Sequence, residues 1–570
     1  MNFYITVNNR EIEAVKGETV LQALKRNGIT VPTLCNMEGF TPTGACRLCM
    51  VEVKGKADLM PACSYPVEEW MEVQTHTARV TQARRVIVEL LLAGHPDDCL
   101  YCERNCHCEL QNLAYELNIR ERKHKGHKVH KIKDLSSPAI LRDPSKCILC
   151  GRCVRVCEEV IGCTALEFSS KGNQAGITTT CGRNMNLSTC ITCGQCVLVC
   201  PTSALYEKKH LSELQQALNH KERYPVAVID PVVTLTLADM YGYRNVRQAA
   251  RQLNAILKRC GFQQVYDYAA VQDLYVTMGA EEVINGNGRT ILSSNCPAWV
   301  KFCEQQMQDQ IPHLSALKSP SQIAGTIIKS RLNEELPSAE PPLRPYVVSI
   351  TPCTARKFEL KRKEFSQLPG PDVDLAITTR ALDQLIRIHG LDLSQVETED
   401  FTPPFHTASL HGEMGGVAGG TMEAMAAAVY QKITEGEELN DPKIRKQRAS
   451  KGVREISFTV KKNTYRFAAV SGMAEAEQFI RDAASRSEKW NYIEVMACPG
   501  GCVEGGGQPI MESGQSARSR QKQMVEMAEK NALTGCYRNR SVLDIASSAE
   551  YMGKPLEELL CTHYNPRNVY

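Results

Sequence analysis

The sequence predicts a multidomain protein that combines α+β and α/β parts, and three observations lead to this fold class. Its length of 570 residues suggests three or four domains. Most of its 26 cysteines lie in the first 200 residues, in spacings typical of metal ligands. Beyond residue 220, hydrophobic segments of strand length alternate with helical segments, which indicates an α/β domain with a mainly parallel sheet.

The composition is that of a globular protein without a nucleic-acid partner or a membrane span. The formal net charge is only +3, whereas a nucleic-acid binder carries a marked basic excess. No apolar run approaches the length of a membrane-spanning helix. The N-terminal residues alternate like a strand and do not resemble a secretory signal. We therefore expect a cytoplasmic protein, whose thiols stay reduced and serve metal binding rather than disulfides.

Residues 1–78 are predicted to form a small domain around one metal centre. Strands are expected at 3–7 and 12–15, and a helix at 19–27. A long loop and its flanks then carry four cysteines with the spacing C-x10-C-x2-C-x13-C: Cys35, Cys46, Cys49 and Cys63. These thiolates could enclose a [2Fe–2S] cluster, although the spacing differs from that of plant ferredoxins. A zinc knuckle built from the same cysteines is the alternative.

A second small module, at 79–118, combines one histidine with three cysteines. A helical pattern ends at Gly94 and is followed by the spacing H-x3-C-x2-C-x5-C: His95, Cys99, Cys102 and Cys108. This set could hold a [4Fe–4S] cluster through one imidazole. Zinc would accept the same ligands, and Cys106 is an alternative ligand to Cys108. The basic segment 119–137 is interpreted as a solvated linker, or alternatively as a docking face for an acidic redox partner.

Residues 138–208 carry the most specific motif in the chain. The run C-x2-C-x2-C-x3-C occurs twice, as in bacterial two-cluster ferredoxins, where the fourth cysteine of each run ligates the other cluster. One [4Fe–4S] cluster is therefore assigned to Cys147, Cys150, Cys153 and Cys200. The second is assigned to Cys190, Cys193, Cys196 and Cys157. The sequence thus predicts a 2[4Fe–4S] ferredoxin domain.

Residues 220–570 are predicted to form the large α/β domain. Strands are expected at 225–229, 290–293 and 346–350, and helices at 246–258 and 381–389. Sites on such sheets lie beyond the carboxyl ends of the strands. Four cysteines follow three predicted strands: Cys296, Cys353, Cys498 and Cys502. We expect their thiolates to converge on one buried metal site.

Over essentially its whole length the chain resembles the catalytic subunit of a modular [FeFe] hydrogenase. The resemblance implies a β-grasp [2Fe–2S] ferredoxin-like domain, a His-ligated cluster module, a 2[4Fe–4S] ferredoxin domain and a large α/β hydrogenase-type domain. In that family the large domain houses the H-cluster, a [4Fe–4S] cubane joined through one cysteine to a diiron unit with CO and CN ligands. By motif, Cys296, Cys353 and Cys498 would bind the cubane. Cys502 would bind it and bridge to the diiron unit.

The departures from the family pattern surround the expected diiron pocket. Asn295 replaces a cysteine that passes protons, and an amide does not titrate in this way. Arg356 replaces a lysine, and the two are not equivalent. Four further positions also differ: Asp230, Ser321, Thr351 and Glu504. An anionic diiron unit would sit against Asp230 and Glu504, and a buried unpaired charge is costly. We therefore expect that hydrogen chemistry has been lost and that the diiron subcluster is absent.

The expected function is electron transfer within a multi-subunit oxidoreductase, with one [2Fe–2S] and four [4Fe–4S] clusters. No P-loop and no well-placed G-x-G-x-x-G is found, so no flavin or nucleotide site is expected in this chain. The resemblance implies as partners an NAD(P)H- or flavin-binding subunit, a formate dehydrogenase-type catalytic subunit or a ferredoxin. The alternative is an active or sensory [FeFe] hydrogenase. Seven cysteines are interpreted as ordinary or spare thiols: Cys106, Cys163, Cys181, Cys260, Cys303, Cys536 and Cys561.

Overall fold

The computed structural model describes residues 2–121, 123–124, 126, 128, 131–286, 288–336, 343–365, 370–439, 452–486, 489–510 and 517–569. Parts of the basic segment 119–137 therefore lie outside the described residues. The chain forms two compact units. The small unit contains Met1–Glu159, Thr164–Ser188 and Val199–Tyr206, and the large unit contains Val160–Cys163, Thr189–Leu198 and Glu207–Tyr570.

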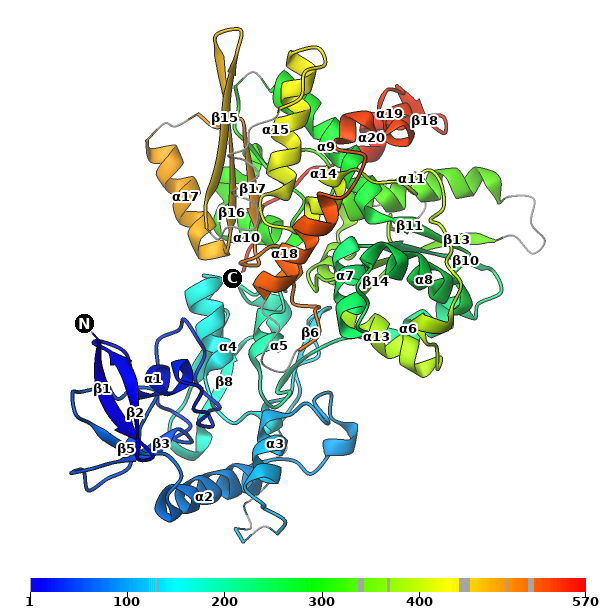
Figure 1. Cartoon of the computed structure of the whole chain (residues 1–570). Helices are drawn as coiled ribbons and strands as arrows, with labels where there is room; N and C mark the ends of the chain where they lie inside the picture. The colour runs from blue at the N-terminus through cyan, green and yellow to red at the C-terminus, as the bar shows by residue number, and fades with distance from the viewer. Residues whose placement is uncertain are drawn as a thin grey trace. The chain divides into compact units, whose positions relative to one another are not determined.

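The small unit begins with a five-stranded mixed sheet of order β2-β1-β5-β3-β4 (Figure 1). Its strands are β1 (Asn2–Val7), β2 (Arg10–Val15), β3 (Met50–Val53), β4 (Met60–Pro61) and β5 (Glu72–Gln74). Helix α1 (Val20–Arg26) starts at a capping box, in which Thr19 and Gln22 each bond the other's backbone. The alternating residues Ile5, Val7 and Ile12 are buried beneath it. The predicted strands and helix of this domain are confirmed.

Several helices and two small sheets complete the small unit. Helices α2 (Ala78–Gly94) and α3 (Glu109–Glu116) bury Val88, Leu110 and Leu113 against Leu34 and Leu48 of the first domain. The remaining elements are α4 (Arg152–Arg155), the paired strands β6 (Ile140–Arg142) and β9 (Leu205–Glu207), and the hairpin of β7 (Leu166–Ser169) and β8 (Gly176–Thr179). Helix α5 (Gln195–Val199) crosses from the large unit into the small one.

The large unit is built on two four-stranded sheets. The first, of order β11-β10-β13-β14, is wholly parallel. Its strands are β10 (Arg223–Ile229), β11 (Gln264–Asp267), β13 (Arg344–Thr351) and β14 (Leu375–Thr378). The second, of order β12-β17-β16-β15, comprises β12 (Ile291–Leu292), β15 (Arg454–Val460), β16 (Asn463–Ser471) and β17 (Tyr492–Met496). Its β15–β16 pair is an antiparallel hairpin that projects from the unit (Figure 1).

The α/β class is confirmed, but the expectation of one mainly parallel sheet needs correction, because the strands divide between two sheets. Residues of both sheets pack in one core with helix α9 (Tyr268–Asn285), which is buried along most of its length. Within β10, Val226 and Val228 face this core, whereas Ala227 and Ile229 face a second core with α8 (Val246–Arg259). Most of α9 is buried, so it lacks an amphipathic pattern, and the sequence gives little sign that residues of two sheets share a core with this helix.

The other helices of the large unit cover these sheets. They are α6 (Leu211–Leu218), α7 (Pro231–Met240), α10 (Pro297–Gln306), α11 (Pro320–Glu335), α12 (Arg356–Glu359), α13 (Thr379–Ile388), α14 (Leu410–Glu413), α15 (Gly420–Ile433), α17 (Met473–Ser485), α18 (Ala517–Ala528), α19 (Arg540–Ala546) and α20 (Leu556–Leu560), with a short hairpin of β18 (Glu550–Tyr551) and β19 (Lys554–Pro555). Among the described residues, no helix is both long and apolar enough to span a membrane.

Candidate metal centres

The four cysteines of the first domain lie together in the small unit. Cys35, Cys49 and Cys63 are almost fully buried, and Cys46 is partly buried. Hydrogen bonds from Cys46 and Cys63 lower the pKa of the Cys35 thiol. The backbone N–H of Leu34 donates to the Cys46 sulfur at 3.4 Å. Clustered sulfurs with a backbone donor fit a thiolate-bound cluster. Among the described residues, no three His, Cys, Asp or Glu side chains have the compact grouping of a single-ion site.

The burial and hydrogen bonding of His95 suit the metal-ligand role that the spacing predicts. The side chain is 8% exposed, and its Nδ1 lies 3.1 Å from the carbonyl oxygen of Pro96. A proton on Nδ1 that is donated to this carbonyl leaves Nε2 with a free lone pair, and Nε2 is buried without a hydrogen-bond partner. Burial also lowers the pKa of His95 and favours the neutral form that ligates metals. Cys102 and Cys108 are partly buried, while Cys99 and Cys106 are exposed.

The first ferredoxin run surrounds a cavity in the small unit. Four cysteines line it, namely Cys147, Cys150, Cys153 and Cys200. Apolar side chains such as Ile148, Ile177 and Leu205 form the rest of the lining. Four sulfurs around one mostly apolar space have the chemistry of a cubane site. The structure therefore brings together the cysteines that the spacing assigns to one cluster.

The second run lies mainly in the large unit. Cys190, Cys193 and Cys196 belong to the segment Thr189–Leu198 of that unit, whereas Cys157 belongs to the small unit. The N–H of Thr192 donates to the Cys190 sulfur at 3.4 Å. The sharing of Cys157 with these three cysteines stays a prediction.

The four cysteines of the large domain line one cavity, as their positions after strands predict. Cys296 follows β12, Cys353 follows β13, and Cys498 and Cys502 follow β17. Burial raises the pKa of Cys353 to about 11 and raises that of Cys498 and Cys502 well above the usual value. A thiolate is therefore unfavourable here without a bound cation, and the donor set fits a cubane. These cysteines follow strands of both sheets rather than of one.

A polar network borders this cavity. The buried Arg356 guanidinium donates through Nη1 to both carboxylate oxygens of Glu359, at 3.1 and 2.9 Å. Through Nη2 it donates to the Tyr268 hydroxyl at 3.0 Å and to Asn295 Oδ1 at 3.1 Å. Asn295 Nδ2 in turn donates to Gln272 Oε1 at 3.4 Å. Asn295 and Arg356 both line the cavity, so the two substituted positions hold each other in place.

Asp230 also lines the cavity that contains the four cysteines. It caps α7, with its Oδ1 accepting from the Val232 N–H at 2.9 Å. Burial raises its pKa to about 6, against the opposing effects of that bond and of Arg356. A carboxyl group therefore stands in the same enclosed space as Cys502.

The other three substituted positions differ in their placement. Thr351 lines the cavity and accepts from the Cys353 N–H at 3.3 Å. Ser321 is not part of the lining. Its hydroxyl donates to that of Ser349 at 2.9 Å. Glu504 does not line the cavity either: its carboxylate lies against Gly500. The expectation that Glu504 faces a diiron unit therefore stays a prediction, and the lining of this cavity does not support it.

The sequence reasoning missed several residues of this site. Tyr268, Gln272 and Glu359 complete the network around Arg356, and Gln195 bonds the sulfur of Cys498. These side chains come from helices α9, α12 and α5. The one available signal was the presence of polar residues in the otherwise apolar pattern of α9, which includes Gln272 and Asp273.

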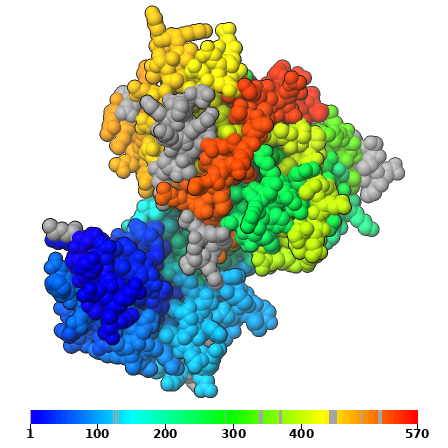
Figure 2. Space-filling view, in the orientation of Figure 1, coloured from blue at the N-terminus to red at the C-terminus, as the bar shows by residue number. Residues whose placement is uncertain are grey.

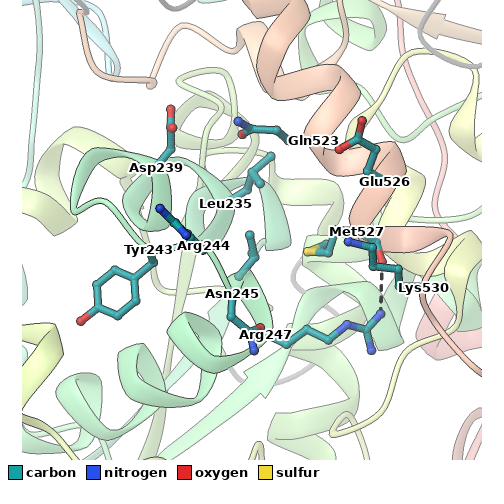
Figure 3. A pocket seen from close by; sticks show the side chains of 11 residues that line it. Leu235, Asp239, Tyr243, Arg244, Asn245, Arg247, Gln523, Glu526, Met527 and Lys530 are labelled. Atoms are coloured by element: carbon teal, nitrogen blue, oxygen red, sulfur yellow. Dashed lines mark hydrogen bonds between the residues drawn. The ribbon is translucent and has the colours of Figure 1, made fainter.

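A larger cavity of about 620 Å³ lies elsewhere in the large unit, between the α7–α8 region and α18 (Figure 3). Figure 2 shows α18 at the surface beside the segment that contains these helices. The lining of this cavity mixes the cations Arg244, Arg247 and Lys530 with Asp239 and Glu526. Arg247 Nη2 donates to the backbone oxygen of Met527 at 3.4 Å. The lining has no cysteine and no consistent charge, so the cysteine cavity is the stronger functional candidate.

Comparisons with known proteins agree with this arrangement of centres. Residues 223–506 match the iron only hydrogenase large subunit, C-terminal domain. Residues 2–78 match a 2Fe-2S iron-sulfur cluster binding domain, and residues 84–123 match the iron-sulfur binding region of NADH-ubiquinone oxidoreductase-G. Residues 139–201 match a 4Fe-4S dicluster domain.

Relatives match over nearly the full length. The NADP-reducing hydrogenase subunit HndD of Solidesulfovibrio fructosivorans is 35% identical over 99% of this chain and 99% of its own. Iron hydrogenase 1 of Clostridium pasteurianum is 30% identical over 89% of this chain and 88% of its own. A solved structure of the apo [FeFe]-hydrogenase of Chlamydomonas reinhardtii aligns with a TM-score of 0.53 and 24% identity, covering 63% of this chain and 99% of that one. The last match concerns the fold alone.

The fold and its cysteine sites define an iron–sulfur protein, and the matched domains indicate [2Fe–2S] and [4Fe–4S] clusters. Full-length similarity to two hydrogenase chains makes the family assignment definite. The chain belongs to the [FeFe]-hydrogenase family, as the motifs predict.

Proposed function

We propose that this chain is the iron–sulfur electron-transfer subunit of a multi-subunit oxidoreductase, built on the [FeFe]-hydrogenase scaffold without hydrogen chemistry. It would hold one [2Fe–2S] and four [4Fe–4S] clusters in the cysteine and histidine sets described above. Bound clusters supply one-electron transfer. The residues of the chain bind them, exclude water and set the charge around each sulfur.

The observation that carries this proposal is that Arg356 is already hydrogen-bonded to other residues of the protein. Two of its four bonds go to the buried carboxylate of Glu359, and the other two go to Tyr268 and Asn295. Both terminal nitrogens therefore already have acceptors from the protein. The position at which the family pattern has a lysine able to bond a cyanide is occupied by a cation that serves an internal network.

Two neighbours of Arg356 support the same conclusion. Asn295 accepts from Arg356 and donates to Gln272, and its amide group cannot take up and release a proton at neutral pH. Asp230 places a carboxyl group in the cavity. An anionic diiron unit there would either face an unpaired charge or force Asp230 to stay protonated.

The second candidate function is an active or sensory [FeFe] hydrogenase. Two observations favour it, namely the four cysteines around one cavity and the full-length similarity to a NADP-reducing hydrogenase subunit. It requires a diiron unit beside Cys502 and a proton route that does not use a thiol at position 295.

The partners follow from the same proposal. The name of the HndD relative supports an NAD(P)H-linked subunit, and therefore a hetero-oligomer. A formate dehydrogenase-type subunit and a ferredoxin are further proposed partners on the strength of the sequence resemblance. We place the protein in the cytoplasm, where thiols stay reduced and available as ligands.

Exposure of the oxidised protein to H2 separates the two functions. A relay subunit without hydrogen chemistry leaves its clusters oxidised under H2, whereas dithionite reduces them, and electron paramagnetic resonance (EPR) records both states. Reduction of the clusters by H2 alone, in protein co-expressed with the hydrogenase maturation enzymes, would contradict the proposal and favour the hydrogenase.

A further inference from the structure

The two ferredoxin runs form the same backbone loop. In the first, Leu149 has a φ of 58° and donates its N–H to the Cys147 sulfur at 3.4 Å. In the second, Thr192 has a φ of 58° and donates its N–H to the Cys190 sulfur at 3.4 Å. Because the loops repeat, residues at the same place in each run can be compared directly.

The residue before the third cysteine of each run reaches a neighbouring centre. In the first run this residue is Arg152, whose Nη1 and Nη2 donate to the two carboxylate oxygens of Glu109, at 2.6 and 2.9 Å. Glu109 directly follows Cys108, a candidate ligand of the His95 module. In the second run the same position is Gln195.

Gln195 reaches a sulfur of the cavity lined by Cys296, Cys353, Cys498 and Cys502, which we call the terminal cavity, and the cubane proposed there the terminal cubane. Its Nε2 lies 3.3 Å from Cys498 Sγ and 2.7 Å from the carbonyl oxygen of Glu504. One amide nitrogen carries two hydrogens, so it can serve both acceptors. The Glu504 carbonyl requires a donor, which fixes the orientation of the amide and directs its second hydrogen to the sulfur. The side chain is 7% exposed, so water competes little for this bond.

The loop around Gln195 is held firmly against the terminal cavity. Thr354 Oγ1 donates to the Thr192 carbonyl at 2.7 Å. Gly194 has a φ of +77°, and a Cβ on it would come within 2.5 Å of the Thr354 hydroxyl. Cys193 of the same loop lines the terminal cavity together with Cys498. The loop that ligates one proposed cubane therefore forms part of the wall of the next.

We propose that Gln195 is the positioning residue that joins these two centres and sets the reduction potential of the terminal cubane through its bond to Cys498. Reduction adds negative charge to the ligand sulfurs, so a donor on a sulfur stabilises the reduced form more than the oxidised form. The potential is thereby raised without an added charge. This inference rests on the part of the proposed function that places a cubane on Cys296, Cys353, Cys498 and Cys502.

The test compares potentials in the full-length protein, purified anaerobically. EPR-monitored redox titration follows each cluster, and the signal that disappears in Cys296→Ser identifies the terminal cubane. Gln195→Met keeps the length of the side chain and removes the donor. We expect the reduction equilibrium of that cubane to fall about tenfold, which is about 59 mV for one electron, with the other signals unchanged.

Gln508→Met is the matched control. Gln508 is 1% exposed in the segment that follows Glu504, and its Nε2 donates to Thr236 Oγ1 and to the Val503 carbonyl rather than to a sulfur. This variant should leave the terminal potential unchanged. An equal shift in Gln508→Met would overturn the inference, because it would show that general loosening of the loop causes the effect.

Two further outcomes are decisive. An unshifted terminal potential in Gln195→Met at full iron content overturns the inference. If that variant does not retain its clusters, Gln195→Leu replaces it: an aliphatic side chain cannot donate, so the potential must fall, and an unchanged or higher value overturns the inference. Absence of a terminal cubane signal in the unaltered protein refutes the proposed cofactor set instead, which separates the two failures.

Discussion

Restoring the cysteine of the family motif, by Asn295→Cys, should destabilise the large unit and create no hydrogen evolution. In the native network Asn295 Oδ1 accepts from the Arg356 guanidinium at 3.1 Å, and Nδ2 donates to Gln272 at 3.4 Å. A thiol is a weak acceptor and cannot replace the amide oxygen. The change therefore removes one acceptor from a buried cation that Glu359 still pairs.

The expected magnitude follows from that lost bond. A hydrogen bond to a charged group contributes about 1.5–3 kcal/mol, and the bond to Gln272 adds about 1 kcal/mol at most. We therefore expect the free energy of unfolding of the large unit to fall by about 1.5–4 kcal/mol. Hydrogen evolution should stay absent, because Arg356 still donates to Glu359 and Asp230 still lines the cavity.

The assay is anaerobic urea unfolding followed by tryptophan fluorescence, with gas chromatography for H2 after co-expression with the maturation enzymes. Two of the three tryptophans, Trp299 and Trp490, are buried in the large unit, whereas Trp70 is 83% exposed in the small unit. Asn254→Cys is the control, because Asn254 is also buried, at 1% exposure against 8% for Asn295, but donates to backbone carbonyls. Unchanged stability of Asn295→Cys, or H2 from that single change, would refute the multi-site account.

Three further predictions test other parts of the structure. Glu207→Gln leaves the charge of the buried Lys357 without its carboxylate and should lower the free energy of unfolding in urea by about 3–5 kcal/mol. The pKa of Glu207 is lowered from 4.5 to about 2, so the stability difference between this variant and the unaltered protein should shrink as pH falls below 4.5. His95→Ala should remove one [4Fe–4S] cluster in an iron assay, whereas Cys106→Ser should remove none; equal iron loss in both would reject the ligand assignment. Burial raises the pKa of Glu413 from 4.5 to about 8, so stability should decrease as pH rises between these values, and Glu413→Gln should flatten that decrease in the urea midpoint.

Local spacing explains why much of the molecule could be predicted. Ligands within a ferredoxin run lie two or three residues apart, so the sequence itself specifies the cavity lined by Cys147, Cys150 and Cys153. The terminal cysteines are far apart in sequence, yet the rule that sites follow parallel strands placed them together. Cys353 after β13 and Cys498 after β17 follow this rule.

Other features depend on contacts that no local pattern encodes. Gln195 bonds a sulfur 303 residues away, and Arg356 reaches Tyr268 across 88 residues. The strands divide into two sheets that share a core with α9, a mostly buried helix that gives no amphipathic signal. The placement of the Glu504 carboxylate against Gly500 depends on the local turn around Gly501, which has a φ of +87°.

Infrared spectroscopy tests the central claim most directly. The protein is purified anaerobically after co-expression with the hydrogenase maturation enzymes, and its iron content is measured in parallel. Bound CO and CN⁻ absorb where protein does not. The account predicts no such bands in protein with its full cubane content, because the residues around Arg356 and Asp230 do not suit a diiron unit. Bands from CO and CN⁻ at near-stoichiometric intensity would contradict it and establish the chain as a hydrogenase or hydrogen sensor.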